Sequence, residues 1–254
     1  MLILNMKNAI CLITVIPKED LLDFYDKIKN YDIFVIVDNN DFDLSNLKLK
    51  FPKFTFVQID NNECIENGFQ NTHLITYCKN VIGWDKVIYK MCQEKNNYRF
   101  MWFVEDDVFI PHEKTLLDID YNKKYEQIDL IANTDYTEGK YYEWLWSMIV
   151  DTIKFEKPYY CGMMCAIRVT PNLLEKIEDY ARNHKTLFFL EAFFPTIVKH
   201  YGLNCLHIDE IKTITYCAEF DDKNIQSSNL YHPIKNIERH SKLRELLYLS
   251  SSFR

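Results

Sequence analysis

Three adjacent carboxylates, Glu105, Asp106 and Asp107, interrupt an apolar stretch in the middle of the chain. The run Phe100–Val104 precedes them and Val108–Ile110 follows them. Three acids at the end of a buried strand are costly unless their charge is compensated, because unpaired buried charge is strongly unfavourable. Mg²⁺ or Mn²⁺ prefers oxygen ligands and would compensate it. The alternative is a solvated turn, but so apolar a strand before the acids favours a metal site.

The chain has 254 residues, of which 48% are hydrophobic, and a net charge of −7, and this composition is typical of a globular protein. This length suits one domain, in which we expect a nucleotide-binding half (1–111) and an acceptor-side half (112–254) with a C-terminal helix. The acidic balance and the absence of a long Lys/Arg cluster argue against nucleic-acid binding. No apolar run reaches the roughly 18 residues of a membrane span, and no signal peptide is evident, so we expect a soluble, cytoplasmic protein.

The eight cysteines are scattered without a CxxC pair. We expect reduced thiols, several of them buried as small hydrophobes. Cys161 and Cys165 are separated by three residues, but no second Cys/His pair has the spacing of a zinc site. The spacing of the cysteines therefore predicts no zinc centre.

Apolar runs that alternate with amphipathic segments predict crossover units and a mostly parallel sheet flanked by helices. The expected strands are 9–16, 33–37, 54–59, 100–104 and 159–169, and the expected helices are 18–30, from 83 onward, 171–182, 191–201 and 237–249. Ligands bind beyond the carboxyl ends of such strands. Asp38, Asp60 and Glu105–Asp107 each follow an expected strand. The sequence therefore predicts an α/β fold with a site at this edge.

The strand that ends in Glu105-Asp106-Asp107 resembles the metal-binding acidic motif of GT-A glycosyltransferases, commonly written Asp-x-Asp. The resemblance implies a GT-A-like, Rossmann-related sheet with a smaller acceptor-side lobe. It implies Mn²⁺ or Mg²⁺ and a nucleotide-sugar donor, with a UDP-sugar favoured. Asp107 would be the direct metal ligand. Glu105 and Asp106 would hold metal-bound water or the hydroxyls of the sugar and ribose. The resemblance also allows Glu105 to contact the metal and Asp106 to take part in catalysis.

The same resemblance places other residues around the nucleotide. Thr14, Val15 and Pro17 would lie beneath it, and Asp38 would bind the base or ribose, unless Asp38 only forms a turn. Trp84 would wall the pocket. Lys86 would reach the phosphates, unless it is an ordinary exposed lysine at a helix start.

The second half carries three further expectations. Glu191 matches the acid that serves as general base toward the acceptor hydroxyl in inverting members, unless it only favours a helix N-terminus. His232 and Lys235 resemble a metal ligand and a diphosphate-binding lysine, which closure of the polar loop 219–229 would bring in. The aromatic run Tyr141, Tyr142, Trp144 and Trp146 would stack on acceptor sugars, unless it packs in the core.

The leading hypothesis is a metal-dependent glycosyltransferase that transfers a sugar to a hydroxyl of a glycan, protein or small molecule. A nucleotidyltransferase is the alternative enzyme. It normally carries a Gly-rich phosphate loop after the first strand, whereas Val15–Glu19 contains no glycine. A non-catalytic nucleotide- or glycan-binding module is the third hypothesis, and it predicts no metal-dependent affinity for nucleotides.

Overall fold

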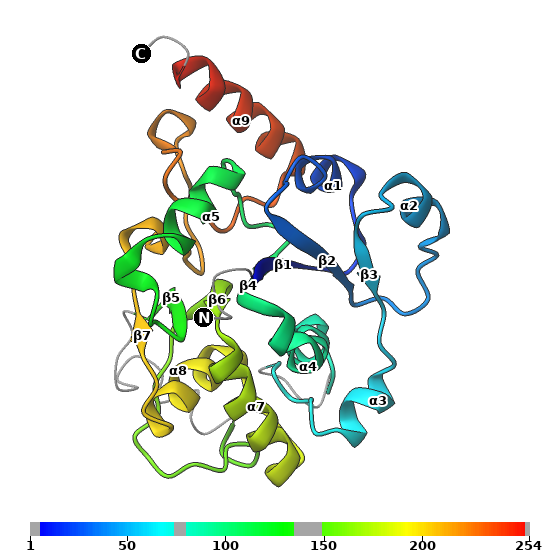
Figure 1. Cartoon of the computed structure of the whole chain (residues 1–254), viewed down its shortest axis with the longest axis vertical. Helices are drawn as coiled ribbons and strands as arrows, with labels where there is room; N and C mark the ends of the chain where they lie inside the picture. Colours follow the sequence, from blue (N-terminus) through cyan, green and yellow to red (C-terminus); the bar gives the residue numbers. More distant parts are fainter. Residues whose placement is uncertain (1–5, 74–79, 135–148, 252–254) are drawn as a thin grey trace.

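A computed structural model describes residues 6–73, 80–134 and 149–251 (Figure 1). Its centre is a seven-stranded sheet with the order β3-β2-β1-β4-β6-β5-β7. Helices cover both faces of the sheet, and this arrangement confirms the predicted α/β class.

The strands of the first half are all parallel. They are β1 (Lys7–Thr14), β2 (Tyr31–Val37), β3 (Thr55–Val57) and β4 (Tyr98–Glu105). β1 lies between β2 and β4, and its residues from Asn8 to Thr14 are all buried. A strand buried on both faces needs a nearly continuous apolar run, and this is why the sequence revealed β1, β2 and β4.

The second half extends the same sheet. Its strands are β5 (Leu130–Asn133), β6 (Met163–Val169) and β7 (Cys205–Leu206). β6 runs antiparallel to both β4 and β5, and β7 is parallel to β5. The sheet is therefore mostly parallel, and β6, between β4 and β5, is the strand that runs in the opposite direction.

The helices form two layers with separate cores. The layer against one face of the sheet contains α4 (Gly83–Glu94), α7 (Pro171–His184) and α8 (Leu190–His200), with α3 (Asn61–Glu66) beside α4. The opposite layer contains α1 (Glu19–Tyr25), α2 (Ser45–Lys50), α5 (Glu113–Asp120) and α9 (Ile237–Ser251). Short 3₁₀ turns occupy Lys95–Asn97, Lys123–Tyr125, Asp209–Ile211 and Asp222–Asn224.

The end of the first strand and the role of the acid after the third strand differ from the expectation. β1 ends at Thr14, and Val15 and Ile16 are 57% and 50% exposed. Asp60 is the N-cap of α3, and its carboxylate accepts the Asn62 N–H at 2.7 Å. The polarity after the third strand therefore reflects a helix cap, a common role for Asp.

A buried ion pair joins the sheet to α5. Arg168 Nη1 lies 3.6 Å from Asp120 Oδ1, and both side chains are fully buried. The Asp120 carboxylate also accepts hydrogen bonds from Asn8 (2.8 Å), Tyr31 (2.7 Å) and Trp102 (3.1 Å). Buried charge is tolerated when it is paired and hydrogen-bonded in this way.

In the described residues, no helix combines the length and apolar character that crossing a bilayer requires. The seven cysteines that the structure describes are free thiols.

Candidate functional site

The carboxyl ends of β1, β2 and β4 meet at one edge of the sheet. Glu105 is the last residue of β4, and Asp106 Oδ2 accepts a hydrogen bond of 2.5 Å from the Thr14 hydroxyl at the end of β1. The Asp38 N–H, just beyond β2, donates to the Thr14 carbonyl at 2.9 Å. Parallel strands place their ends together, so the three predicted polar positions 14, 38 and 105–107 lie in one region.

His232 reaches this edge from a segment more than a hundred residues away in sequence. The segment is held by backbone hydrogen bonds: Phe109 and Tyr231 exchange N–H···O bonds of 2.8 and 3.1 Å, and the Ile234 N–H donates to the Asp107 carbonyl at 2.8 Å. His232 itself forms a bridge with Ile214. The histidine is thus already docked, whereas the sequence interpretation relied on loop closure to bring it in.

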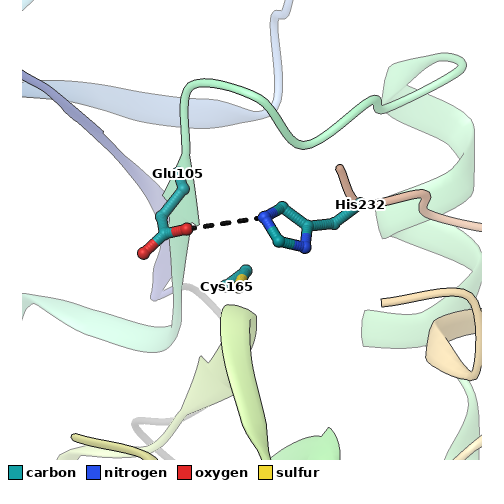
Figure 2. Close-up of side chains that lie close together, drawn as sticks. All are labelled: Glu105, Cys165 and His232. Carbon is teal, nitrogen blue, oxygen red and sulfur yellow. Dashed lines mark ion pairs between the residues drawn. The ribbon is translucent and has the colours of Figure 1, made fainter. Parts of the chain in front are cut away.

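The imidazole of His232 lies between two of the acids. Its Nε2 is 3.2 Å from Asp107 Oδ1 and 3.7 Å from Glu105 Oε2 (Figure 2 shows the Glu105 contact). Its Nδ1 donates to the Thr215 carbonyl at 2.7 Å, so Nε2 is the nitrogen that faces the carboxylates. The structure therefore brings together the three predicted metal ligands, Glu105, Asp107 and His232.

Burial and mutual repulsion shape the acidity of these groups. Burial, reinforced by the charge of Asp107, raises the pKa of Glu105 and of Asp106. Burial also acts to raise the pKa of Asp107, but the hydrogen bond and charge of His232 lower it below its usual value. Burial opposes protonation of His232, yet its pKa is raised because Asp107 and Glu105 favour the imidazolium.

The first turn of α4 packs against the carboxyl ends of β1 and β4. Gly83 packs so tightly that an added Cβ would lie 2.6 Å from the Ile13 side chain, so this close approach requires glycine. Trp84 is 3% exposed and its indole N–H donates to Glu105 Oε1 at 2.7 Å, so it orients the acid from within the core.

Lys86 is 1% exposed, and its ammonium lies 3.2 Å from Asp38 Oδ1 and 2.9 Å from Asn40 Oδ1. The alternative of an ordinary exposed lysine is therefore wrong. The ammonium neutralises Asp38 and holds the loop after β2.

Glu191 lies in the first turn of α8, as its position in the sequence suggested. Burial raises its pKa to about 7, and the charge of Glu105 acts in the same direction while His232 opposes it. Glu191 is therefore within electrostatic reach of the acidic strand end. A carboxyl group poised near neutral pH matches the requirement of a general base.

Two cavities lie beside α1 and α9. A cavity of about 490 Å³ is lined by Lys18, Glu19, Asp20, Lys235, Asn236, Ile237 and Glu238. Lys18 and Lys235 are exposed, and they act electrostatically on Asp106 and Asp107 respectively. The larger cavity, about 910 Å³, is lined by residues of α1, the Pro111–His112 loop and α9. None of the three acids lines either cavity, but the smaller one carries the two lysines that act on Asp106 and Asp107, so the smaller one is the candidate for chemistry.

Two further sets of residues were expected at the site, the turn around Pro17 and the aromatic run 141–146. Pro17 is buried beside exposed Val15, and the aromatic run 141–146 lies outside the described residues.

The sequence analysis did not predict Lys18, although it directly follows the predicted nucleotide turn. It also missed Cys165, whose Sγ lies within 4.8 Å of ligand atoms of Glu105 and His232 (Figure 2). Only knowledge of how β6 pairs with β4 would have revealed it.

Comparisons with known proteins bear on the fold. No protein-family model matches the chain, and no curated protein matches it in sequence. Among solved structures, the galactosyltransferase LgtC, in complex with donor and acceptor sugar analogs, is 8% identical with a TM-score of 0.50, over 94% of this chain and 96% of that one.

Two further solved structures correspond more loosely, with TM-scores below 0.5. A glycosyltransferase involved in glycosylation of the major capsid of PBCV-1 is 11% identical, with a TM-score of 0.38 over 96% of this chain and 99% of that one. The 4-diphosphocytidyl-2C-methyl-D-erythritol synthase of Anaerococcus prevotii DSM 20548 is 10% identical, with a TM-score of 0.42 over 96% of both chains. The sheet order and the likeness to LgtC show that the protein has a GT-A-like α/β fold.

Proposed function

We propose that this protein is a metal-dependent glycosyltransferase that moves a sugar from a nucleoside-diphosphate sugar to a hydroxyl acceptor. The observation that carries the proposal is the convergence of Glu105, Asp107 and His232 at the carboxyl end of β4. This is the edge at which α/β sheets bind their ligands. The likeness to LgtC, whose solved structure holds donor and acceptor sugar analogs, supports the choice of reaction class.

The residues at this edge fit a divalent cation. Two carboxylates and one imidazole are the donors, and the Thr215 carbonyl fixes the imidazole with Nε2 directed at the carboxylates. Such outer hydrogen bonds orient metal-binding histidines. When bound, Mn²⁺ or Mg²⁺ supplies positive charge against the diphosphate leaving group.

The donor would lie across the ends of β1 and β2. Exposed Val15 and buried Pro17 form the turn beneath the nucleotide, and Asp38, held by Lys86, faces the base or ribose. Lys86 thus acts through Asp38 in this proposal. Lys18 and Lys235 flank the smaller cavity and supply cations for the diphosphate. We favour a UDP-sugar as donor.

Two acids would act on the sugar and the acceptor. Asp106, fixed by the Thr14 hydroxyl, accepts hydrogen bonds from the donor sugar. Glu191 accepts the proton of the acceptor hydroxyl as that oxygen attacks the sugar carbon. A base with a pKa of about 7 is half ionised at neutral pH and retains enough basicity to take the proton.

The first test is the thermal stability of the full chain with nucleotide sugars and nucleoside diphosphates, in Mn²⁺ and in EDTA. A ligand that binds only the native state raises the melting temperature by mass action. We expect one nucleotide class to raise it in Mn²⁺ but not in EDTA. The Asp107→Asn variant should lose this shift, whereas the matched control Asp118→Asn, an exposed acid on α5, should keep it.

Release of nucleoside diphosphate from the donor, which requires no identified acceptor, then tests the chemistry. A shift with CTP and release of pyrophosphate would replace the proposal with nucleotidyl transfer. Metal-independent nucleotide binding, or none in a folded protein, would favour the binding-module hypothesis.

A further inference from the structure

A sulfur atom lies among the oxygen and nitrogen donors of the acidic site. Cys165 belongs to β6, which pairs antiparallel with β4 in the register Phe103↔Ile167 and Val104↔Ala166. The next step of that register places Cys165 opposite Glu105. Directly opposed residues in such a pair have Cβ atoms roughly 5 Å apart, so the sheet itself brings the thiol to the carboxylate.

Three ligand types converge at this point. One ligand atom each of Glu105, Cys165 and His232 lies within 4.8 Å of the other two (Figure 2). In a tetrahedral site with metal–oxygen and metal–nitrogen bonds of about 2.1 Å, neighbouring donors lie roughly 3.4 Å apart. Glu105 Oε2 and His232 Nε2 are 3.7 Å apart, so a shift of a few tenths of an ångström would form one edge of such a site.

The two partners of Cys165 are oriented by groups behind them. Trp84 holds Glu105 Oε1 from the core, and this leaves Oε2 directed at His232. The Thr215 carbonyl holds His232 Nδ1, and this leaves Nε2 directed at Glu105. Cys165 is only 8% exposed, and its Sγ lies within 4.8 Å of the ligand atoms of Glu105 and His232. Outer contacts of this kind are typical of metal ligands.

We propose that Cys165 is a metal ligand and that this site takes a thiophilic divalent cation, Zn²⁺ or Co²⁺, in preference to Mg²⁺. The proposal rests on the proposed function, because Glu105 and His232 hold the same ion. On binding, the thiol proton leaves to solvent, a metal–sulfur bond forms and no electron is transferred. Thiolate ligands select zinc-like ions, whereas all-oxygen sites suit Mg²⁺.

The test is spectroscopic and needs no substrate. Co²⁺ titrated into the full-length, metal-free protein should produce thiolate-to-cobalt charge-transfer absorption in the near ultraviolet. Cys165→Ser should abolish this band and weaken Co²⁺ binding by at least about tenfold, the lower end of the loss seen when even outer-shell partners are changed. The matched control Cys161→Ser, which removes another buried thiol four residues away, should keep both.

The wild-type protein keeps the proposal falsifiable if Cys165→Ser does not fold. Absence of the charge-transfer band in wild type overturns the assignment, as does a band that Cys165→Ser retains. In competition on wild type, excess Mg²⁺ should leave bound Co²⁺ in place, and ready displacement would overturn the stated preference.

The outcome is separable from that of the proposed function. If Mg²⁺ or Mn²⁺ supports nucleotide binding while Co²⁺ gives no thiolate band, the role of Cys165 fails and the proposed function stands. If the band appears but no nucleotide binds with any metal, the metal site stands and the proposed function fails.

Discussion

Two charged clusters lie on the same pair of strands, three residues apart, and they are built in opposite ways. At Trp102 and Arg168, which are partners in the β4–β6 register, Asp120 meets a guanidinium and three hydrogen-bond donors. At Glu105, further along β4, two of three consecutive acids, Glu105 and Asp107, share the nearby His232. The first cluster is nearly neutral and closed, whereas the second has excess negative charge.

The pKa values express the same difference. Burial raises the pKa of Asp120 to about 6, which is still below neutrality because Arg168 and the hydrogen bonds favour the carboxylate. Glu191, near the acidic strand end, reaches about 7 because burial and the charge of Glu105 act together. Balanced buried charge of the first kind is structural. Acids that repel one another beside a sheet edge are typical of a site that binds a cation.

The largest expected effect comes from breaking the balanced cluster. Arg168→Met leaves Asp120 buried without its cation and should destabilise the fold by about 3–5 kcal/mol. Urea unfolding measures this. Arg99→Met is the control, because it removes a pair with Glu126 that is partly exposed and contributes less than about 1 kcal/mol. Equal losses in the two variants would show that the network is not what stabilises this region.

The acidic cluster should respond differently, by losing activity more than stability. Asp107→Asn should lower the free energy of unfolding of the metal-free protein only slightly, because His232 favours the Asp107 carboxylate whereas burial opposes it. Donor turnover in Mn²⁺ should fall by at least about 100-fold, roughly 2.7 kcal/mol of transition-state stabilisation. Steady-state release of nucleoside diphosphate gives the rate. A variant that is both active and less stable would make this acid structural.

Glu191→Gln tests the comparison through the pH dependence of the free energy of unfolding. The pKa of Glu191 is higher in the folded state than the usual 4.5 of the unfolded chain, so the folded state retains the proton longer. Its ionisation therefore costs stability progressively as pH rises from about 4.5 to 7. Relative to wild type in EDTA, the Gln variant should be equally stable near pH 4 and more stable at pH 8, by on the order of 1–3 kcal/mol.

Urea midpoints at the two pH values check this expectation. Glu175→Gln, an exposed acid on α7, should show no such pH-dependent difference. A stability gain for Glu191→Gln that is the same at both pH values would argue against a raised pKa.

The smallest expected effect concerns a single hydrogen bond at the site. Thr14→Val removes the donor to Asp106 at nearly constant volume. Nucleotide affinity should fall only a few-fold, in line with the roughly 0.5–1.5 kcal/mol of an ordinary hydrogen bond. Isothermal titration with nucleoside diphosphate and Mn²⁺ measures it, and Thr55→Val, on the short strand β3, is the control. An unchanged affinity would remove Asp106 from the donor site.

The contrast also explains what the sequence revealed. The apolar runs of β1, β2 and β4 were visible because strands buried on both faces leave no polar alternation, and the acids after Val104 stood out against them. The docking of His232 against β4 was not visible, since it depends on backbone bonds across more than a hundred residues. Cys165 escaped notice because its position opposite Glu105 is set by antiparallel register, and Arg168 because its partner Asp120 lies on α5, and no local pattern of residues records either contact.

Lys86 illustrates a different limit. Its place at the start of a helix suggested either a phosphate ligand or an exposed side chain, but the close approach of Gly83 to β1 brings the first turn of α4 inward, where Lys86 meets Asp38. Propensity and spacing describe one element at a time. The depth at which a side chain ends depends on how two elements pack.

The backbone pairing of Tyr231 with Phe109 has a consequence for the order of events during folding. The candidate ligands at positions 105 and 107 leave the ribosome long before His232, and closing so long a loop is entropically unfavourable until the sheet has formed. A partly synthesised chain therefore presents an incomplete ligand set. Under the proposed function, acquisition of the ion would become a late step of maturation, and cation affinity would report whether the segment that carries His232 has docked on β4.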